Sequence, residues 1–305
     1  MSRGRAAGYR LLGGGLDYLL HLRPAEWPIM AAHTALGYLL ATGLADWAEP
    51  TRLLPALLGL LLWVVCLNGG TLAINSAFDR DEGDVAYLRN PPPPPARLAG
   101  VSLGLMAVGQ LLAFALPLRF AAVYAVCFLL SVLYSVPPVR LKAVAGADWV
   151  INMWGFGTLT PYAGWVATGL PIRPPLGLVL LAFCPLFAAL YPLTQLYQLE
   201  EDSRRGDRTL AVVLGVRRSL TAALVSAAIA FGIFAAAGLR SDWSGAGAPG
   251  RWAALLVAAS AWAGMLLPWW RRAEQCTPAE HQRGMYRALA AWAVTDVAVL
   301  LAWLP

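Results

Sequence analysis

Residues 54–74 read LPALLGLLLWVVCLNGGTLAI and carry no charged side chain. A membrane-spanning helix needs about 20 mostly apolar residues, because the hydrocarbon layer is about 30 Å thick and a helix rises about 1.5 Å per residue. This stretch meets that requirement, and so do eight others in the 305-residue chain. We therefore predict an all-α, polytopic membrane protein with nine transmembrane helices, over residues 28–45, 54–74, 98–116, 121–136, 150–170, 176–196, 220–239, 252–270 and 285–304.

The overall composition agrees with a membrane protein. The chain is 59% hydrophobic and only 13% charged, whereas soluble proteins carry about 25% charged residues. A soluble or disordered protein is thereby excluded. The net charge of +6 does not indicate a nucleic-acid partner, because the basic residues are scattered singly or in pairs between apolar runs. We predict one membrane-embedded domain over residues 1–305, with residues 1–27 as a cytoplasmic N-terminal segment.

The positions of the basic residues predict an orientation. Cytoplasmic loops of membrane proteins hold an excess of Lys and Arg. With the N-terminus inside, 18 of the 23 basic residues fall in inner segments. The outer segments hold Arg52, Arg119, Arg173, Arg240 and Arg251. The sequence thus predicts an integral protein of the cell inner membrane, with its N-terminus cytoplasmic and its C-terminus outside.

Acidic residues gather in two of the predicted inner loops. Eight of the 17 lie there: Asp79, Asp81, Glu82, Asp84, Glu200, Glu201, Asp202 and Asp207. Each cluster directly follows a predicted membrane helix. If the second helix continues, Asn75, Asp79 and Glu82 share one face, at i, i+4 and i+7. On the sixth helix, Gln198, Glu201 and Asp202 would be related in the same way, at i, i+3 and i+4.

Clustered carboxylates repel one another, and a shared divalent cation relieves the repulsion. Oxygen ligands without His or thiol spacing favour Mg²⁺, which commonly bridges carboxylates to phosphate. The two clusters therefore predict a metal and diphosphate site at the mouth of a lipid-accessible cavity. The alternative is that they are solvated loop charges, as charge runs usually are.

Three motifs in order resemble those of one enzyme family. Residues 75–84 (NSAFDRDEGD) resemble the first aspartate-rich motif of the UbiA superfamily of intramembrane prenyltransferases. Residues 134–142 (YSVPPVRLK) are similar to a segment of its chlorophyll synthase and homogentisate prenyltransferase branches, and residues 200–210 (EEDSRRGDRTL) to its second aspartate motif. The Arg23-Pro24 pair also fits. The resemblance implies a nine-helix bundle of the UbiA type.

This chain departs from the family pattern at several positions. The Asp expected eight residues after Asn75 is Gly83, and an Asp often found four residues before Asp202 is Gln198. The loop after the first motif contains five consecutive prolines, at 91–95. Such a run favours a stiff polyproline II segment that either braces a lid or acts only as a spacer.

The resemblance implies Mg²⁺-dependent transfer of a prenyl group from a prenyl diphosphate to an aromatic or other lipophilic acceptor within the membrane. The implied metal ligands are Asn75, Asp79, Glu82, Asp84, Gln198, Glu201 and Asp202. The implied diphosphate-binding residues are Arg89, Arg140, Lys142 and Asn152. Asp79, Asp202 and Tyr134 are the implied catalytic residues, Tyr134 through its aromatic face near a developing carbocation.

Two other functions remain open at this stage. A UbiA-type terpene cyclase would ionise the same diphosphate and trap the cation within the same molecule. A non-catalytic lipid-binding or transport protein could share the fold. Two polar residues inside predicted spans, His33 and Asp296, are either functional or simply paired, because a carboxylate within the membrane is costly unless it is neutralised.

Overall fold

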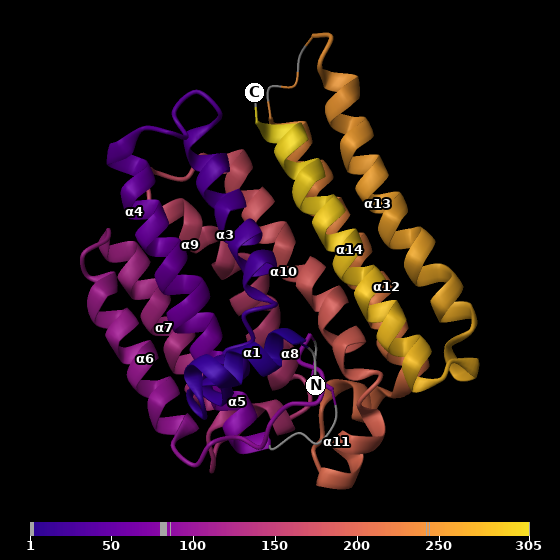
Figure 1. The fold of residues 1–305 in the computed structure, drawn as a ribbon. Coiled ribbons are helices and arrows are strands. Elements are labelled where there is room, and N and C mark those ends of the chain that lie inside the picture. The colour runs from indigo at the N-terminus through magenta and orange to yellow at the C-terminus, as the bar shows by residue number, and fades with distance from the viewer. Residues whose placement is uncertain (1–2, 80–83, 86, 242, 244, 305) are drawn as a thin grey trace. The chain divides into compact units, whose positions relative to one another are not determined.

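The computed structural model describes residues 3–79, 84, 85, 87–241, 243 and 245–304, and the regular elements in this part of the chain are helices (Figure 1). In a bilayer, each backbone N–H and C=O must find a partner within the protein, and a helix supplies these partners within one segment. An apolar chain of this composition therefore folds as helices. The predicted all-α class is confirmed.

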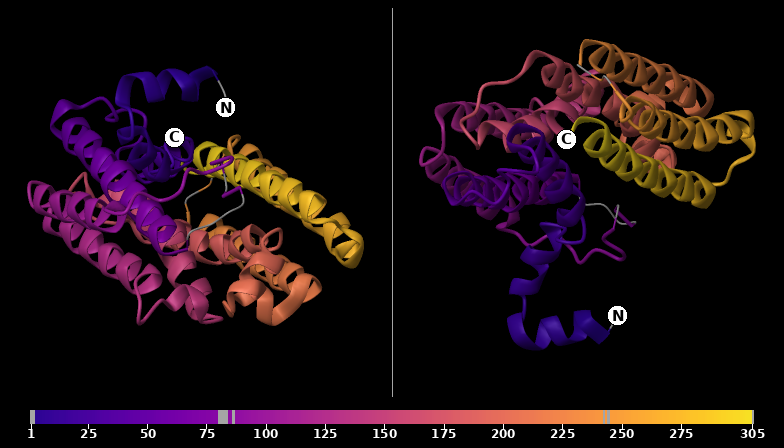
Figure 2. Two further views of the ribbon diagram at one scale, coloured as in Figure 1. Left: turned by 60° about the horizontal axis from the view of Figure 1, so that its bottom comes forward. Right: turned by 90° about the horizontal axis from the view of Figure 1, so that it is seen from above.

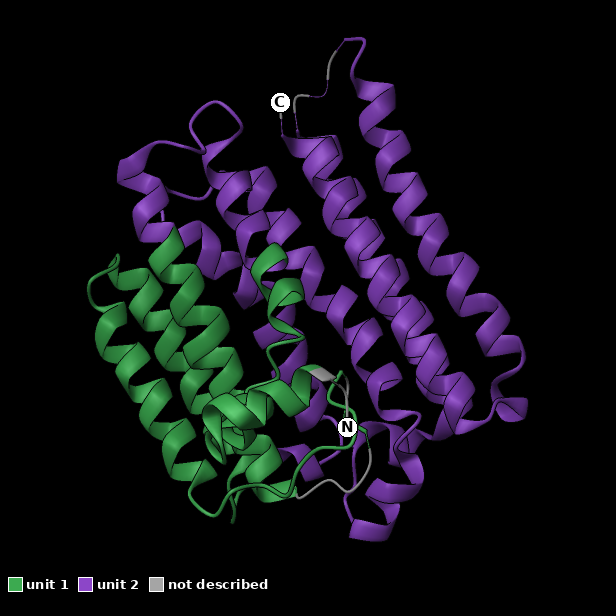
Figure 3. Ribbon diagram, in the orientation of Figure 1, with its two compact units in different colours: residues 1–32, 57–140 green, residues 33–56, 141–305 purple. Residues whose placement is uncertain are grey.

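The chain divides into two compact units (Figure 3). Unit 1 comprises Met1–Ala32 and Leu57–Arg140, and unit 2 comprises His33–Ala56 and Leu141–Pro305. The single membrane domain over residues 1–305 stays a prediction.

Unit 1 is built from helices that carry the first acidic motif and its neighbours. Its helices are α1 (Arg3–Leu12), α2 (Gly15–His21), the π-helix η1 (Leu62–Gly69), α5 (Gly70–Asp79), α6 (Leu98–Ala113) and α7 (Leu118–Ser135). α5 packs against both α6 and α7. In the core of unit 1, the ring of Trp63 meets those of Phe120 and Tyr124 edge to face. Two helices cross the border between the units, α3 (Trp27–Thr42) and α4 (Pro50–Leu61).

Unit 2 holds the second acidic motif and four long helices. Its elements are η2 (Leu141–Ala143), α8 (Ala147–Asn152), the π-helix η3 (Met153–Leu159), α9 (Thr160–Val166), α10 (Pro174–Gln195), α11 (Leu199–Arg205), α12 (Leu210–Arg240), α13 (Ala248–Arg271), η4 (Ala273–Gln275) and α14 (Pro278–Trp303). α10 packs along α12, and α13 along α14 (Figures 1 and 2). α12 is broken at Gly215, which has a φ of 73°.

Six helices of the described residues are long and apolar enough to span a membrane. They are Pro50–Asp79, Leu118–Ser135, Pro174–Gln195, Leu210–Arg240, Ala248–Arg271 and Pro278–Trp303. The other three predicted spans coincide with α3, with the shorter apolar helix α6, and with the consecutive helical segments α8, η3 and α9. The several apolar spanning helices are therefore confirmed, and the count of nine spans stays a prediction.

α3 and α9 approach so closely in unit 2 that only glycine fits at the crossing. A Cβ atom added to Gly37 would lie 1.7 Å from the carbonyl oxygen of Pro161, and one added to Gly164 would lie 1.9 Å from that of Thr34. Small residues allow membrane helices to pack backbone against backbone. These two glycines thus fix how α3 packs against α9.

We expect Gly37→Ala to destabilise the protein by about 3 kcal/mol, because the new methyl group meets a backbone carbonyl that cannot move freely. The midpoint of thermal unfolding in detergent measures this effect. Gly104→Ala is the matched control, since a Cβ there meets nothing within 4 Å. Equal midpoints for the two variants would contradict this account of the crossing.

Candidate functional site

The first acidic motif lies at the end of one long helical run in unit 1. Residues 50–79 are helical throughout, so the second predicted span continues into the motif and places Asn75 and Asp79 one turn apart. The side chain of Asp79 is 1% exposed, and its Oδ1 lies 3.1 Å from Nη2 of Arg140. The hydroxyl of Ser135 donates to Oδ1 of Asn75 at 3.4 Å. The first and second of the three motifs therefore meet within unit 1.

Arg23 of the early Arg-Pro pair reaches the same helix. Its Nη2 donates to the hydroxyl of Ser76 at 3.3 Å, and its Nη1 lies 3.7 Å from Glu26. Burial raises the pKa of the Glu26 carboxyl, and the charge of Arg23 partly offsets that rise. Three separate sequence landmarks thus converge around α5.

The proline-rich loop of unit 1 is held by the N-terminal helices. Nη1 of Arg5 donates to the carbonyl of Asn90 at 2.8 Å, and Nε2 of His21 lies 3.1 Å from the carbonyl of Pro92. Asp84 accepts from the backbone N–H of Asn90 at 2.9 Å, so one of its carboxylate oxygens closes this loop. Arg89 is exposed. These contacts favour a brace over a mere spacer.

A predicted metal ligand, Glu82, and a predicted catalytic residue, Tyr134, also belong to this region of the sequence. Glu82 lies outside the described residues. Tyr134 is half-buried on α7, directly before the Ser135 that contacts Asn75. Its position in the chain is thus consistent with a place near the first motif.

The second acidic motif forms a short helix of its own in unit 2. α10 ends at Gln195, and Gln198, with φ −108° and ψ 6°, precedes α11. The prediction that Gln198, Glu201 and Asp202 continue the sixth membrane helix is therefore wrong. The reason is that the side chain of Gln195 is bound by partners elsewhere in unit 2, and the chain turns directly after it.

One arginine holds the carboxylates of this helix. Nη2 of Arg205 lies 2.6 Å from Asp202, its Nη1 lies 3.3 Å from Glu201, and its Nε lies 3.4 Å from Asp207. Asp202 and Asp207 are both buried. Asp207 was not among the predicted ligands, although the glycine before it could have indicated it: Gly206 has a φ of 77° and ends α11, which turns Asp207 back toward the helix.

Burial raises the pKa of Asp202 above that of an ordinary carboxyl group. The hydrogen bond and charge of Arg205 lower this pKa, as does the charge of Lys142, while Asp207 raises it. Lys142 is buried on η2, and the neighbouring carbonyl of Ala143 accepts from the N–H of Arg208 at 3.3 Å. The C-terminal ends of the second and third of the three sequence motifs (residues 134–142 and 200–210) thus lie side by side in unit 2.

A fully buried carboxylate, Asp148, organises this part of unit 2. One of its oxygens accepts from the backbone N–H groups of Gly146, at 2.9 Å, and Trp149, at 2.8 Å. The other accepts from Nε2 of Gln195, at 3.0 Å, and from the N–H of Leu210, at 2.9 Å. Asp148 thereby joins α8 to α10 and α12.

The side chain of Gln195 makes two further hydrogen bonds in the network around Asp148. Its Nε2 also donates to the hydroxyl of Tyr191 at 3.0 Å, and its Oε1 accepts from the N–H of Ala211 at 3.1 Å. Both ends of residues 196–209, which carry the second acidic motif, are thereby fixed to Asp148 and Gln195. The position of the motif therefore depends on two buried polar side chains outside it.

Asn152 has a local role in the same helix as Asp148. Its Nδ2 donates to the carbonyl of Asp148 at 2.8 Å. An amide nitrogen carries two N–H donors, so the second one remains for a phosphate oxygen.

The two polar residues within predicted spans of unit 2 are paired with each other. Nδ1 of His33 lies 3.1 Å from Oδ1 of Asp296, and its Nε2 lies 3.1 Å from the carbonyl of Gly157 in η3. The rings of Phe183 and Trp292 contact the imidazole edge to face. Both ring nitrogens of His33 thus have a partner within unit 2. This is the simple pairing that the sequence left open for Asp296.

The acidic residues suit a hard cation by their chemistry. Within the residues that the structure describes, no three His, Cys, Asp or Glu side chains gather as a metal-binding group. Asp79 and Asp202 instead compensate their buried charge with an arginine each. Their oxygen donors, with the amide oxygen of Asn75 one turn from Asp79, are of the type that Mg²⁺ prefers.

The family model described as the UbiA prenyltransferase family matches residues 30–294. The chain belongs to this family. It is therefore a membrane enzyme of the UbiA prenyltransferase type, as its motifs predicted. The match does not distinguish between branches of the family, so the likeness to chlorophyll synthase and homogentisate prenyltransferases stays a prediction. No curated protein matches the chain.

Solved structures share the fold of this UbiA-family enzyme. A UbiA homolog from Archaeoglobus fulgidus bound to GPP and Mg²⁺ has a TM-score of 0.66 at 20% identity, and the match covers 93% of this chain and 99% of that one. The same homolog bound to DMAPP and Mg²⁺ gives 0.64 at 20% identity, covering 92% and 99%. A digeranylgeranylglyceryl phosphate synthase gives 0.68 at 14% identity, covering 94% and 98%.

We expect Asp148→Ala to lower the stability of the UbiA-family enzyme by about 3 kcal/mol, because it leaves four buried or partly buried N–H donors without their acceptor. It should also speed trypsin cleavage after Arg204 and Arg208, which are exposed in the segment that Asp148 anchors. Unfolding in detergent and a timed digestion measure the two effects. Asp46→Ala, at an exposed aspartate, is the control. An unchanged digestion rate would contradict the anchoring role.

We expect Asp202→Asn to be more stable than the native protein at neutral pH. Since the pKa of Asp202 is raised, the folded state binds its proton more tightly than the unfolded chain does, and stability falls as the pH rises through this raised value. The stability gain of the variant should vanish near pH about 4, where an ordinary carboxyl group is also protonated. Unfolding midpoints from pH 4 to 8 measure it, with Glu200→Gln, at an exposed carboxylate of α11, as control. A gain that persists at the lowest pH would point to packing instead of charge.

Proposed function

We propose that this UbiA-family enzyme transfers the prenyl group of a prenyl diphosphate to a lipophilic acceptor within the membrane, with an electron-rich aromatic ring as the first candidate. The observation that carries the proposal is the contact between buried Asp79 and Arg140. It joins an acidic motif suited to a metal with a basic motif suited to a diphosphate. The GPP- and Mg²⁺-bound homolog supports the same ligand class.

The first motif is proposed as one Mg²⁺ site, with Asn75, Asp79, Glu82 and Asp84 as its ligands. Asp79 supports this assignment because its charge is almost fully buried and lies 3.1 Å from the guanidinium of Arg140. Removing an uncompensated charge from water costs several kcal/mol, so a carboxylate is kept at such a position only with a cationic partner. A metal ion could replace Arg140 as that partner and leave its guanidinium to bind phosphate oxygens.

The second motif is proposed as the other Mg²⁺ site, with Gln198, Glu201 and Asp202 as ligands. Asp202 and Arg205 form the same kind of pair as Asp79 and Arg140. Arg205 keeps its contact with Asp207 if a metal ion takes Asp202 and Glu201. Mg²⁺ bound to these ligands would neutralise the charge that develops on the leaving diphosphate.

The basic residues are proposed to orient the diphosphate. Arg140 and Lys142 flank Leu141 in the sequence, and Lys142 is near enough to Asp202 to lower its pKa. Arg89 is exposed in the braced loop. These side chains would donate charge-assisted hydrogen bonds to phosphate oxygens, which stabilises the anion as its bond to the allylic carbon breaks. Asn152 completes the predicted set through the second N–H of its amide.

Tyr134 is proposed to stabilise the allylic cation through its ring face. Exclusion of water is the other requirement, because water would quench the cation, and the apolar helices around the motifs meet it. After the aromatic acceptor attacks the cation, the acceptor ring loses a proton and regains its aromaticity. The cytoplasmic placement of both motifs and the inner-membrane location stay part of this proposal.

We expect Asp79→Asn to lower turnover at least tenfold without unfolding the protein, because it removes charge from the site and leaves packing in place. Purified protein is assayed with a radiolabelled prenyl diphosphate, Mg²⁺ and a panel of aromatic and isoprenoid acceptors, with and without a chelator. Asp46→Asn, at an exposed aspartate paired with Arg52, is the matched control.

The products decide between the possible functions. A prenylated acceptor that forms only with Mg²⁺ supports the proposal. A cyclised hydrocarbon that forms without acceptor would instead indicate a terpene cyclase, which the departures at Gly83 and Gln198 keep open. Full activity of Asp79→Asn would overturn the metal assignment.

A further inference from the structure

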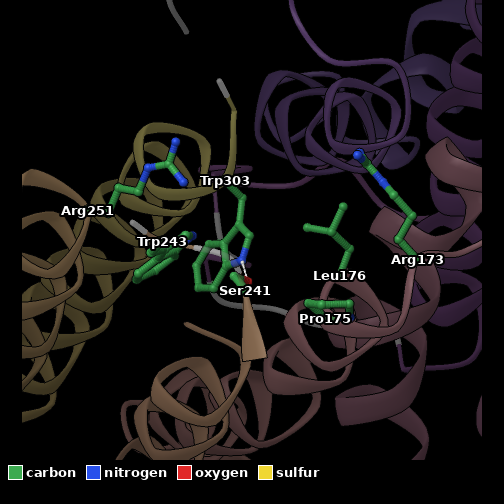
Figure 4. A pocket seen from close by; sticks show the side chains of 7 residues that line it. All are labelled: Arg173, Pro175, Leu176, Ser241, Trp243, Arg251 and Trp303. Atoms are coloured by element: carbon green, nitrogen blue, oxygen red, sulfur yellow. Dashed lines mark hydrogen bonds between the residues drawn. The ribbon is translucent and has the colours of Figure 1, made fainter. Parts of the chain in front are cut away.

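A pocket of about 200 Å³ lies at one end of the long helices of unit 2 (Figure 4). The described residues that line it are Arg173, Pro175, Leu176, Ser241, Trp243, Arg251 and Trp303. They come from the beginnings of α10 and α13, from the end of α14, and from the residues that follow α12. At about 30 Å³ per water molecule, the volume holds roughly seven waters, which is enough for a small polar headgroup but not for acyl chains.

The pocket lies at the opposite end of these helices from the second acidic motif. α10 has 22 residues between the pocket at its beginning and Gln195 at its end, and a helix of that length extends about 33 Å. This distance matches the hydrocarbon thickness of a bilayer, about 30 Å. The pocket therefore stands at the level of the lipid headgroups, on the side away from Asp202.

Its floor is apolar and aromatic. The ring of Trp303 lies 4.9 Å from that of Trp243, which lies 4.9 Å from that of Trp252. Nε1 of Trp303 donates to the hydroxyl of Ser241 at 2.9 Å, which fixes the ring in the centre of the pocket (Figure 4). Tryptophans are enriched at the boundary between hydrocarbon and headgroups, where an apolar ring meets a polar surface.

Two arginines stand on either side of Trp303 (Figure 4). Arg251 lies over the ring of Trp243, with its guanidinium carbon 5.9 Å from the ring centre. Nη2 of Arg173 donates to the carbonyl of Leu40 at 3.0 Å, so both cations are held in place by neutral partners. No carboxylate is among the described lining residues. In the sequence, one acid, Asp242, follows Ser241; it lies outside the described residues and leaves these segments with a net positive charge.

The distribution of charge along the whole chain makes these arginines unusual. The five basic residues that fall on the predicted outer side are exceptions to the inner-side excess. Two of the five line this pocket, and Arg240 ends the helix beside it. Two cations without a described carboxylate beside them suit an anionic ligand, and the anion that a bilayer supplies at this depth is a lipid phosphate.

We propose that this pocket binds the phosphodiester headgroup of an anionic phospholipid. Arg173 and Arg251 donate to the phosphate oxygens, the Trp303 ring contacts the glycerol part, and the acyl chains follow the apolar surfaces of α10 and α14 into the bilayer. Guanidinium groups suit this ligand because their fork of N–H donors matches phosphate oxygens. The bound lipid ties together the ends of four helices and thereby stabilises unit 2.

Lipid titration of the purified full-length protein tests this proposal. Phosphatidylglycerol, phosphatidylcholine and inorganic phosphate are added separately in detergent, and binding is followed by native mass spectrometry and by the thermal unfolding midpoint. The native protein should bind phosphatidylglycerol and gain stability from it, with a much weaker response to the other two. Equal responses to phosphatidylcholine, or an equal response to inorganic phosphate, would overturn recognition of an anionic lipid.

Variants locate the site. Arg173→Gln/Arg251→Gln should weaken phosphatidylglycerol binding at least tenfold. Arg119→Gln/Arg218→Gln removes the same charge from exposed positions that do not adjoin the pocket and should change binding less than twofold. Arg251→Gln alone keeps the Arg173 contact with Leu40, so it reports on binding if the double variant unfolds, and a threefold or greater loss is expected. An equal loss in both double variants, or no loss in Arg251→Gln, would overturn the proposal.

Discussion

The carboxylate of Asp148 connects the parts of unit 2 on which the catalytic proposal depends. It is fully buried, and four N–H groups from three segments of chain donate to its two oxygens. Such a charge is tolerated inside an apolar bundle because each of its two oxygens accepts two hydrogen bonds. Through Gln195 and Leu210, it fixes both ends of the segment that carries Asp202. The second motif is thus positioned from outside.

Buried carboxylates are paired with a nitrogen-bearing side chain at both acidic motifs and also at Asp296. Asp79 has Arg140, Asp202 has Arg205, and Asp296 has His33. In a medium of low dielectric constant, such a partner is required for folding before any ligand arrives. The pairs at the two acidic motifs also provide groups that a substrate complex needs. The carboxylate can bind a metal ion, and the arginine can then bind a diphosphate. The His33 pair, which lies beside a π-helical carbonyl, serves packing between α3, η3 and α14.

Sequence reasoning was accurate where the signal is local and periodic. Apolar length predicted the spanning helices, and helical spacing predicted that Asn75 and Asp79 lie one turn apart, which the continuous helix over residues 50–79 confirms. The same reasoning was wrong at Gln198, because the turn after Gln195 depends on hydrogen bonds to Asp148 and Ala211, which are distant in the chain. Asp207 was missed for a related reason: its burial follows from a glycine turn and a shared arginine.

The sequence by itself determined the membrane class, the family and the residue types available for chemistry, because composition and short motifs express the requirements of lipid and diphosphate directly. The tertiary structure decided which of those residues are partners. It brought Arg23, Asn75 and Arg140 together around α5, made Asp148 a junction of three segments, and collected two outer arginines around Trp303. These outcomes depend on contacts between residues from 47 to 133 positions apart, and no local pattern encodes such contacts.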